Sequence, residues 1–289
     1  MIPGIDSYCF HRYFGDAYPG LETDPGERLD VWGFLDRALE LGAQGVSLEA
    51  CYLPADDPFL DRLRERLDTN GLQRVWAWGH PNGLGSGTRS EAVEDLARHL
   101  AAARRVGAGV MRICCGGRRT RPADWPSHRD ALLPLLRSLL PVAEAQGVVM
   151  AIENHLDLFS EELVELLERV DSAWLGVCLD TANNVRLGED PLVVVRRLAP
   201  WTRATHLKDV APLAGAGDAF TSWPSVPLGH GVVDVAAVVQ LLRGAGYDGL
   251  LAVEIDYLHP LHGTDERAAL RTSMQVLRES LAKSRPLTG

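Results

Sequence analysis

The chain has 289 residues, 46% hydrophobic and 24% charged, which supports a large core and excludes a disordered chain. Its formal net charge of −10 gives no overall attraction to nucleic acid or to anionic membranes. No apolar run is long enough to cross a bilayer, and residues 1–6 lack the basic start of a signal peptide. Five cysteines without a Cys-x-x-Cys spacing indicate reduced, mostly buried thiols. We therefore expect a soluble cytoplasmic protein that binds neither nucleic acid nor membrane.

Short β-branched apolar runs alternate with amphipathic segments along the chain. The predicted strands are residues 2–9, 45–49, 75–79, 110–114, 148–153, 175–180, 204–208 and 250–255. The clearest helical segments are residues 29–41, 90–106, 160–170, 191–198 and 267–281. Glycines such as Gly107 and Gly147 follow helical segments, where a left-handed residue ends a helix. Eight strands alternating with helices predict one α/β domain over residues 1–289, a (β/α)8 TIM barrel.

An open doubly wound sheet is the alternative fold, because it also alternates strands with helices. That fold usually carries a glycine-rich phosphate loop after its first strand, whereas this chain continues Ser-Tyr-Cys-Phe-His at residues 7–11. The longest irregular stretches are residues 116–127 and 210–231. In a barrel we expect both stretches at the C-terminal ends of the strands, where active sites lie.

The last four strands of the predicted barrel end in side chains that bind metals. These side chains are Glu153, Asp180, His206 and Glu254. Three carboxylates and one imidazole suit a divalent cation such as Mn²⁺, Mg²⁺ or Co²⁺, with Zn²⁺ also open. A carboxylate that ends an apolar strand is also costly to bury without a cation. The pattern therefore predicts a metal centre, although a single strand-end carboxylate is more often a cap or a solvated loop residue.

The sequence around these four residues resembles the xylose isomerase-like TIM barrels, the sugar isomerase and epimerase superfamily that also contains endonuclease IV. The resemblance rests on Ala-Ile-Glu-Asn-His, Cys-Leu-Asp-Thr, Thr-His-Leu-Lys-Asp and Val-Glu-Ile-Asp around the four residues, and on residues 229–234. It implies one divalent cation, with Mn²⁺ favoured, held by Glu153, Asp180, His206 and Glu254. It also implies that Glu153 and Glu254 move the proton of a metal-stabilised enediolate.

The resemblance leaves three functions open. The first is an isomerase or epimerase of a small ketose or keto-polyol. The second is a lyase that decarboxylates or dehydrates an oxidised sugar, sugar acid or cyclitol, as inosose dehydratases and 3-oxo-isoapionate decarboxylases do. The third is a non-catalytic metal- or sugar-binding protein. Asn183 stands where ketohexose epimerases and endonuclease IV carry a histidine, which weighs against both of those branches.

Lys208 is one of only two lysines among 29 basic residues. It lies two residues past His206 on a strand, so it faces the same pocket, and we assign it a catalytic role. Its ammonium group could bind a substrate carboxylate, protonate an enolate, or have a pKa shifted towards neutrality. The alternative is a structural ion pair with Asp209 or Asp180.

Other side chains near the strand ends are predicted to bind the substrate, a small carbohydrate. They are Tyr8, His11, His80, Arg112, His155 and Asn183. His99 and His128 lie in helical or pre-helical segments and are expected at the surface. The sequence leaves the oligomeric state open, a homo-oligomer included.

Overall fold

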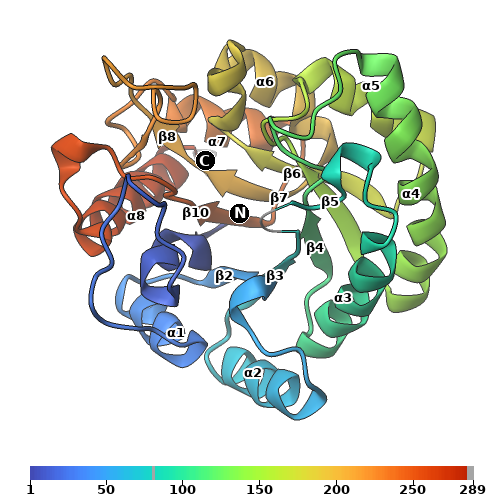
Figure 1. The fold of residues 1–289 in the computed structure, drawn as a ribbon. Coiled ribbons are helices and arrows are strands. Elements are labelled where there is room, and N and C mark those ends of the chain that lie inside the picture. The colour runs from blue at the N-terminus through green and yellow to red at the C-terminus, as the bar shows by residue number, and fades with distance from the viewer. Residues whose placement is uncertain (80–81, 285–289) are drawn as a thin grey trace, which may run out of the picture.

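The computed structural model of this chain describes residues 1–79 and 82–284. Within these residues eight parallel strands close into a barrel in the order β1-β10-β7-β6-β5-β4-β3-β2, which confirms the predicted TIM barrel. Helices surround the strands (Figure 1). The barrel strands are β1 (Ile2–Asp6), β2 (Gly45–Glu49), β3 (Gln73–Ala77), β4 (Val110–Ile113), β5 (Val149–Glu153), β6 (Leu175–Asp180), β7 (Thr202–Leu207) and β10 (Leu250–Val253).

Eight α-helices of the described residues pack their apolar faces against the barrel. They are α1 (Val31–Glu40), α2 (Asp57–Thr69), α3 (Ala92–Val106), α4 (Trp125–Gln146), α5 (Ser160–Val170), α6 (Pro191–Leu198), α7 (Val235–Gly244) and α8 (Glu266–Lys283). Six of them begin after an aspartate whose carboxylate accepts a hydrogen bond from a backbone N–H of the first turn. Gly107 and Gly147 end α3 and α4 at φ 82° and 63°, as predicted.

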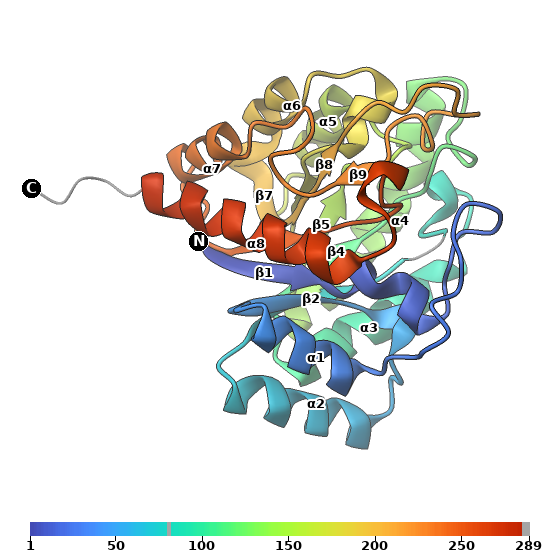
Figure 2. The same ribbon diagram turned by 90° about the vertical axis from the view of Figure 1, so that its left-hand side faces the viewer.

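Two predicted segments differ from the observed elements. The first strand ends at Asp6, because the Asp6 carboxylate accepts a hydrogen bond of 2.6 Å from the Tyr8 backbone N–H and starts a 3₁₀ helix, η1 (Ser7–Phe14). The irregular stretch 210–231 contains part of a small antiparallel sheet, formed by β8 (Asp209–Val210) and β9 (Ser225–Val226). The two long irregular stretches, residues 116–127 and 210–231, lie at the C-terminal ends of the barrel strands, on the right in Figure 2.

Side chains from all around the barrel form the core, including four of the five cysteines, none of which is paired. The prediction that His128 lies at the surface is wrong. His128 is fully buried, with its Nε2 3.5 Å from Asp157 Oδ2. His99 is also partly buried, and its ring accepts a hydrogen bond from the Trp76 indole. No helix in the described part of the chain has the length and apolarity that crossing a membrane requires.

A buried ion pair joins the first and last segments of the barrel. Arg12 of η1 lies 2.5 Å from Glu266 of α8, and their side chains are 4% and 3% exposed. Replacing Glu266 with Gln leaves the buried guanidinium without its counter-charge, so unfolding free energy should fall by about 3 kcal/mol. Urea denaturation measures this loss. The exposed pair between Asp24 and Arg28 is the control: Asp24→Asn should change stability little, and an equally small effect of Glu266→Gln would contradict the prediction.

Candidate active site

The four predicted metal-binding residues converge at the mouth of the barrel. Each offers one ligand atom, these atoms lie within 4.8 Å of one another, and all four side chains are buried. Glu153 ends β5, Asp180 ends β6, His206 lies in β7, and Glu254 directly follows β10. These four strands are neighbours in the sheet, so the residues form an arc with Glu153 and Glu254 at its two ends.

The donor set fits a divalent cation. His206 Nδ1 lies 3.6 Å from Glu153 Oε1 and 3.4 Å from Glu254 Oε2. His206 Nδ1 is shielded from solvent and makes no hydrogen bond, whereas the buried oxygens Asp180 Oδ2 and Glu254 Oε2 have an ion pair with Lys208. Buried polar atoms without hydrogen bonds are costly unless a cation or another partner satisfies them. Carboxylate oxygens with one imidazole nitrogen form a common site for Mn²⁺, Mg²⁺ and related ions.

The second nitrogen of His206 faces a carboxylate that the sequence did not single out. His206 Nε2 lies 3.3 Å from Oδ2 of Asp6, which is fully buried at the end of β1. A carboxylate at this position favours the imidazole tautomer that carries its proton on Nε2, which would leave the Nδ1 lone pair available to a cation. Asp6 is therefore a positioning residue for His206.

Replacing Asp6 with Asn should weaken divalent-cation binding by about 10- to 100-fold, because the orientation of the ligand imidazole is no longer fixed by a charge. Isothermal titration with Mn²⁺ measures the change. Asp218→Asn is the control, because Asp218 lines the same cavity but is not one of the four ligand residues. Equal affinity of the two variants would show that Asp6 does not orient His206.

Lys208 shares the face of His206, as predicted. Its Nζ lies 2.8 Å from Glu254 Oε2 and 3.1 Å from both Asp180 Oδ2 and Asp256 Oδ2. The alternative partner Asp209 instead accepts hydrogen bonds from backbone N–H groups of the loop that follows β9. Although burial lowers the pKa of Lys208, the three carboxylates raise it well above its usual value. Lys208 therefore stays an ammonium ion, the opposite of a shift towards neutrality.

Arg112 holds the other end of the arc. Its Nε lies 3.1 Å from Glu153 Oε2, and its Nη2 pairs with Glu49. Burial raises the pKa of Glu153, but Arg112 and His206 together hold it well below its usual value. At Glu254 burial acts in the same direction, and Lys208 with His206 lowers the pKa to about 2. Both carboxylates are therefore ionised at neutral pH and able to accept a proton.

A cavity of about 760 Å³ opens at this end of the barrel, and Glu153 and Glu254 line it. Four of the predicted substrate-binding residues line it: Tyr8, Arg112, His155 and Asn183. Asn183 donates a hydrogen bond of 3.0 Å to Glu153 Oε1. His11 does not line the cavity, and its two ring nitrogens contact the Tyr8 carbonyl and Glu22. His80 lies outside the described residues.

The two irregular stretches supply the mouth of the cavity. Arg118, Arg119 and Thr120 come from the loop after β4, and Asp218 and Phe220 come from the loop between β8 and β9. The two arginines are exposed. The long loops thus lie where the barrel prediction placed them.

Sequence reasoning missed one further ion pair at the cavity. Arg186 Nη1 lies 2.7 Å from Asp256 Oδ2, and its guanidinium lies 4.6 Å from the centre of the Phe220 ring. Asp256, two residues past Glu254, can be recognised from the sequence as a strand-end candidate, whereas its pairing with Arg186 cannot. Arg186 comes from a 3₁₀ helix, η4 (Asn183–Leu187), and no sequence pattern marks it.

Comparison with known families agrees with this geometry. The family described as xylose isomerase-like TIM barrel matches residues 35–280. The chain belongs to this family. It is 35% identical over 258 residues to 2-epi-5-epi-valiolone 7-phosphate 2-epimerase from Actinoplanes, covering 86% of this chain and 89% of the relative. It is 28% identical over 247 residues to 3-oxo-isoapionate decarboxylase from Pectobacterium atrosepticum, covering 84% and 81%.

Solved structures of the family share the fold. A crystal structure of the IOLI protein with a bound zinc atom superposes with a TM-score of 0.75 at 16% identity, covering 99% of this chain and all of the other. Relatives within the family are thus named as an epimerase and as a decarboxylase of sugar-like compounds. Both names describe enzymes, which supports an enzymatic role for this member of the family.

Proposed function

We propose that this protein is a divalent-cation-dependent epimerase or isomerase of a small ketose or keto-polyol. The observation that carries the proposal is the placement of Glu153 and Glu254 at the two ends of the arc, on either side of His206 and Asp180. Each carboxylate is ionised and contacts its own cationic side chain, Arg112 or Lys208. An epimerase that inverts a carbon needs one group to remove a proton from one face of that carbon and a second group to return a proton to the opposite face.

A bound cation would offset the negative charge of the enediolate formed when the proton leaves carbon. Glu153 takes that proton on one face and later releases it to solvent. Glu254, which is ionised in the free protein, takes up a proton from solvent through the open cavity and delivers it to carbon on the other face. Asn183 and Lys208 hold these carboxylates in place through Glu153 Oε1 and Glu254 Oε2. We propose Mn²⁺ as the cation, with Mg²⁺, Co²⁺ and Zn²⁺ as the alternatives that the same donor set accepts.

The substrate we propose is a cyclic keto-polyol that carries an anionic group. The name of the Actinoplanes relative, a cyclitol phosphate epimerase, supports this class. The exposed side chains of Arg118 and Arg119 line the cavity that contains the proton carriers, and guanidinium groups suit phosphate oxygens.

Nucleic acid and membrane are not expected as partners. The single domain, the cytoplasmic location and a homo-oligomeric state stay predictions.

A lyase reaction is the second candidate. The decarboxylase relative and the position of Lys208 support it, because an ammonium beside the four ligand residues could protonate the carbanion left by loss of carbon dioxide. In this reaction Lys208 is the proton donor. Neither glutamate then has to take a proton from carbon.

Incubation with Mn²⁺ in D₂O distinguishes the two reactions. Keto-polyols, cyclitol ketones, their phosphates and keto acids of oxidised sugars are the compounds to test. We expect deuterium at the carbon beside the carbonyl and an inverted product, with a lower KM for phosphorylated compounds. Release of carbon dioxide or water would instead support the lyase. The Glu254→Gln variant is the control that must lose the reaction, and absence of both exchange and turnover with every compound would overturn the proposed function.

A further inference from the structure

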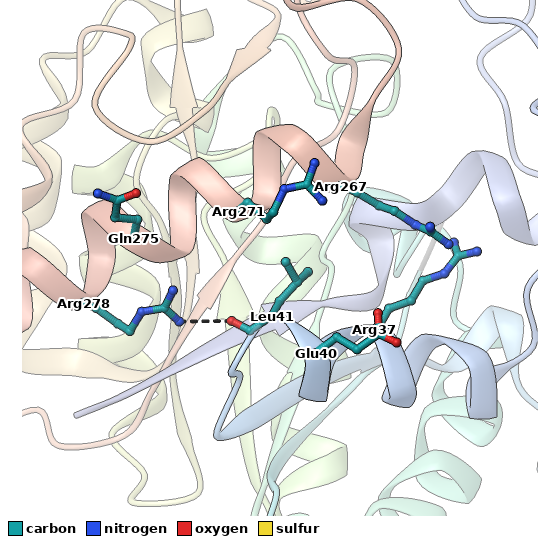
Figure 3. A pocket seen from close by; sticks show the side chains of 7 residues that line it. All are labelled: Arg37, Glu40, Leu41, Arg267, Arg271, Gln275 and Arg278. Carbon is teal, nitrogen blue, oxygen red and sulfur yellow. Dashed lines mark hydrogen bonds between the residues drawn. The ribbon is translucent and has the colours of Figure 1, made fainter.

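A second concave region lies on the outer wall of the barrel. It is a groove of about 650 Å³ between α1 and α8, which we call the arginine groove (Figure 3). Its lining residues are Arg37, Glu40, Leu41, Arg267, Arg271, Gln275 and Arg278. Four guanidinium groups and one carboxylate line this groove on a chain whose net charge is −10. None of these residues lines the cavity that Glu153 and Glu254 line.

Several helices of this protein place an arginine four residues from an acidic partner. Arg98 pairs with Glu94 on α3, and Arg169 pairs with Glu165 on α5, each at a spacing of four residues. On α8 the residue four positions after Arg267 is Arg271. Like charges at this spacing repel and destabilise a helix. Among the described residues, no recorded ion pair involves Arg267, Arg271 or Arg278, so an anion from outside the chain could offset this repulsion.

Two of the four guanidinium groups are held in place before any ligand arrives. Arg278 donates a hydrogen bond of 3.0 Å to the Leu41 carbonyl. The Arg37 guanidinium lies over the rings of Phe10 and Tyr13, at 5.5 Å and 5.1 Å from their centres. Its Nη2 lies 3.2 Å from Glu27, whereas its Nη1 is shielded from solvent and has no hydrogen-bond partner.

The remaining arginines come from α8. Figure 3 shows the side chains of Arg37 and Arg267 pointing toward one another from the two helices. Two cations that face each other repel, and an anion bound between them would offset that repulsion. The groove therefore combines fixed donors, an unsatisfied donor atom and a local excess of positive charge.

We propose that the arginine groove binds a small molecule that carries two or more phosphate groups. Guanidinium groups bind phosphate oxygens through paired, charge-assisted hydrogen bonds. Arg267 and Arg278 are eleven residues apart, or about 16 Å along the helix axis, which exceeds the width of one phosphate group. Several phosphate groups can engage arginines of both walls at once. This binding site is separate from the proposed reaction and does not depend on it.

Titration calorimetry with inorganic pyrophosphate at physiological salt tests the proposal. We expect saturable binding to the wild-type protein, and affinity at least ~10-fold lower for the Arg267→Gln/Arg271→Gln variant, which loses charge-assisted hydrogen bonds. Inorganic phosphate should bind at least ~10-fold more weakly than pyrophosphate. Because pyrophosphate also chelates divalent cations, the titration is made with protein dialysed against a chelator and repeated with the cation restored.

The matched control is Arg62→Gln/Arg104→Gln, which removes the same charge from exposed positions on α2 and α3. It should bind pyrophosphate with wild-type affinity. Arg278→Gln is a second groove variant and should weaken binding as well. Three outcomes would overturn the proposal: no saturable binding to the wild type, equal weakening in the groove and control variants, or equal affinity for phosphate and pyrophosphate.

Discussion

Replacing His206 with Ala should abolish stoichiometric binding of the divalent cation. His206 supplies the nitrogen at the centre of the arc, and its Nδ1 faces both Glu153 and Glu254. Without it only the three carboxylates remain as donors, so the cation loses one of its four protein ligands. The loss of affinity should exceed the 10- to 100-fold expected for Asp6→Asn, because a ligand is removed rather than reoriented. Glu153→Gln should lose the cation in the same way.

Metal analysis after gel filtration, with Mn²⁺ supplied in the buffer, measures this result. His155→Gln is the matched control, since His155 is a cavity-lining histidine outside the ligand group. It should keep one cation per chain. Retention of a stoichiometric cation by both His206→Ala and Glu153→Gln would show that the four residues are not a metal site.

The barrel and the convergence of the four candidate ligand residues could be predicted because both depend on local sequence. Each strand is a short apolar run, and in a parallel barrel the ends of all strands meet at one face. A carboxylate or imidazole at four such ends must converge, whatever the exact strand tilt. For this reason Glu153, Asp180, His206 and Glu254 could be placed together without a structure.

The contacts that surround the ligands could not be predicted in this way. Asp6 reaches His206 although β10 lies between their strands, and that contact depends on how the closed barrel is staggered. Arg186 lies on a 3₁₀ helix of five residues, which is too short to give a periodic pattern. The burial of His128 cannot be predicted from helical periodicity alone, because its neighbour Asp157, whose Oδ2 lies 3.5 Å from His128 Nε2, comes from the segment after β5.

Replacing Lys208 with Met should lower kcat by ~10²–10⁴ if the ammonium gives a proton to a carbanion, as a positioned acid does. Lys208 contacts Glu254 and Asp180, so its charge also acts on the ligand residues themselves. If Lys208 instead only orients a hydroxyl of a neutral ketose, the loss should be ~10-fold, about one hydrogen bond. Lys208→Arg should restore little of the larger loss, because a guanidinium is bulkier and does not release its proton.

The pH dependence of the Lys208→Met variant separates these roles from a change in folding. Lys208 lowers the pKa of Glu254, so its removal raises that pKa. Glu254 then becomes protonated at higher pH, and the acid limb of the kcat/KM profile should shift to higher pH. Lys283→Met, near the end of α8, is the control and should leave both kcat and the profile unchanged. A fully active Lys208→Arg enzyme with an unshifted profile would contradict the catalytic role of Lys208. Either kind of cation would then suffice beside Glu254, and the scarcity of lysine in this chain would carry no functional meaning.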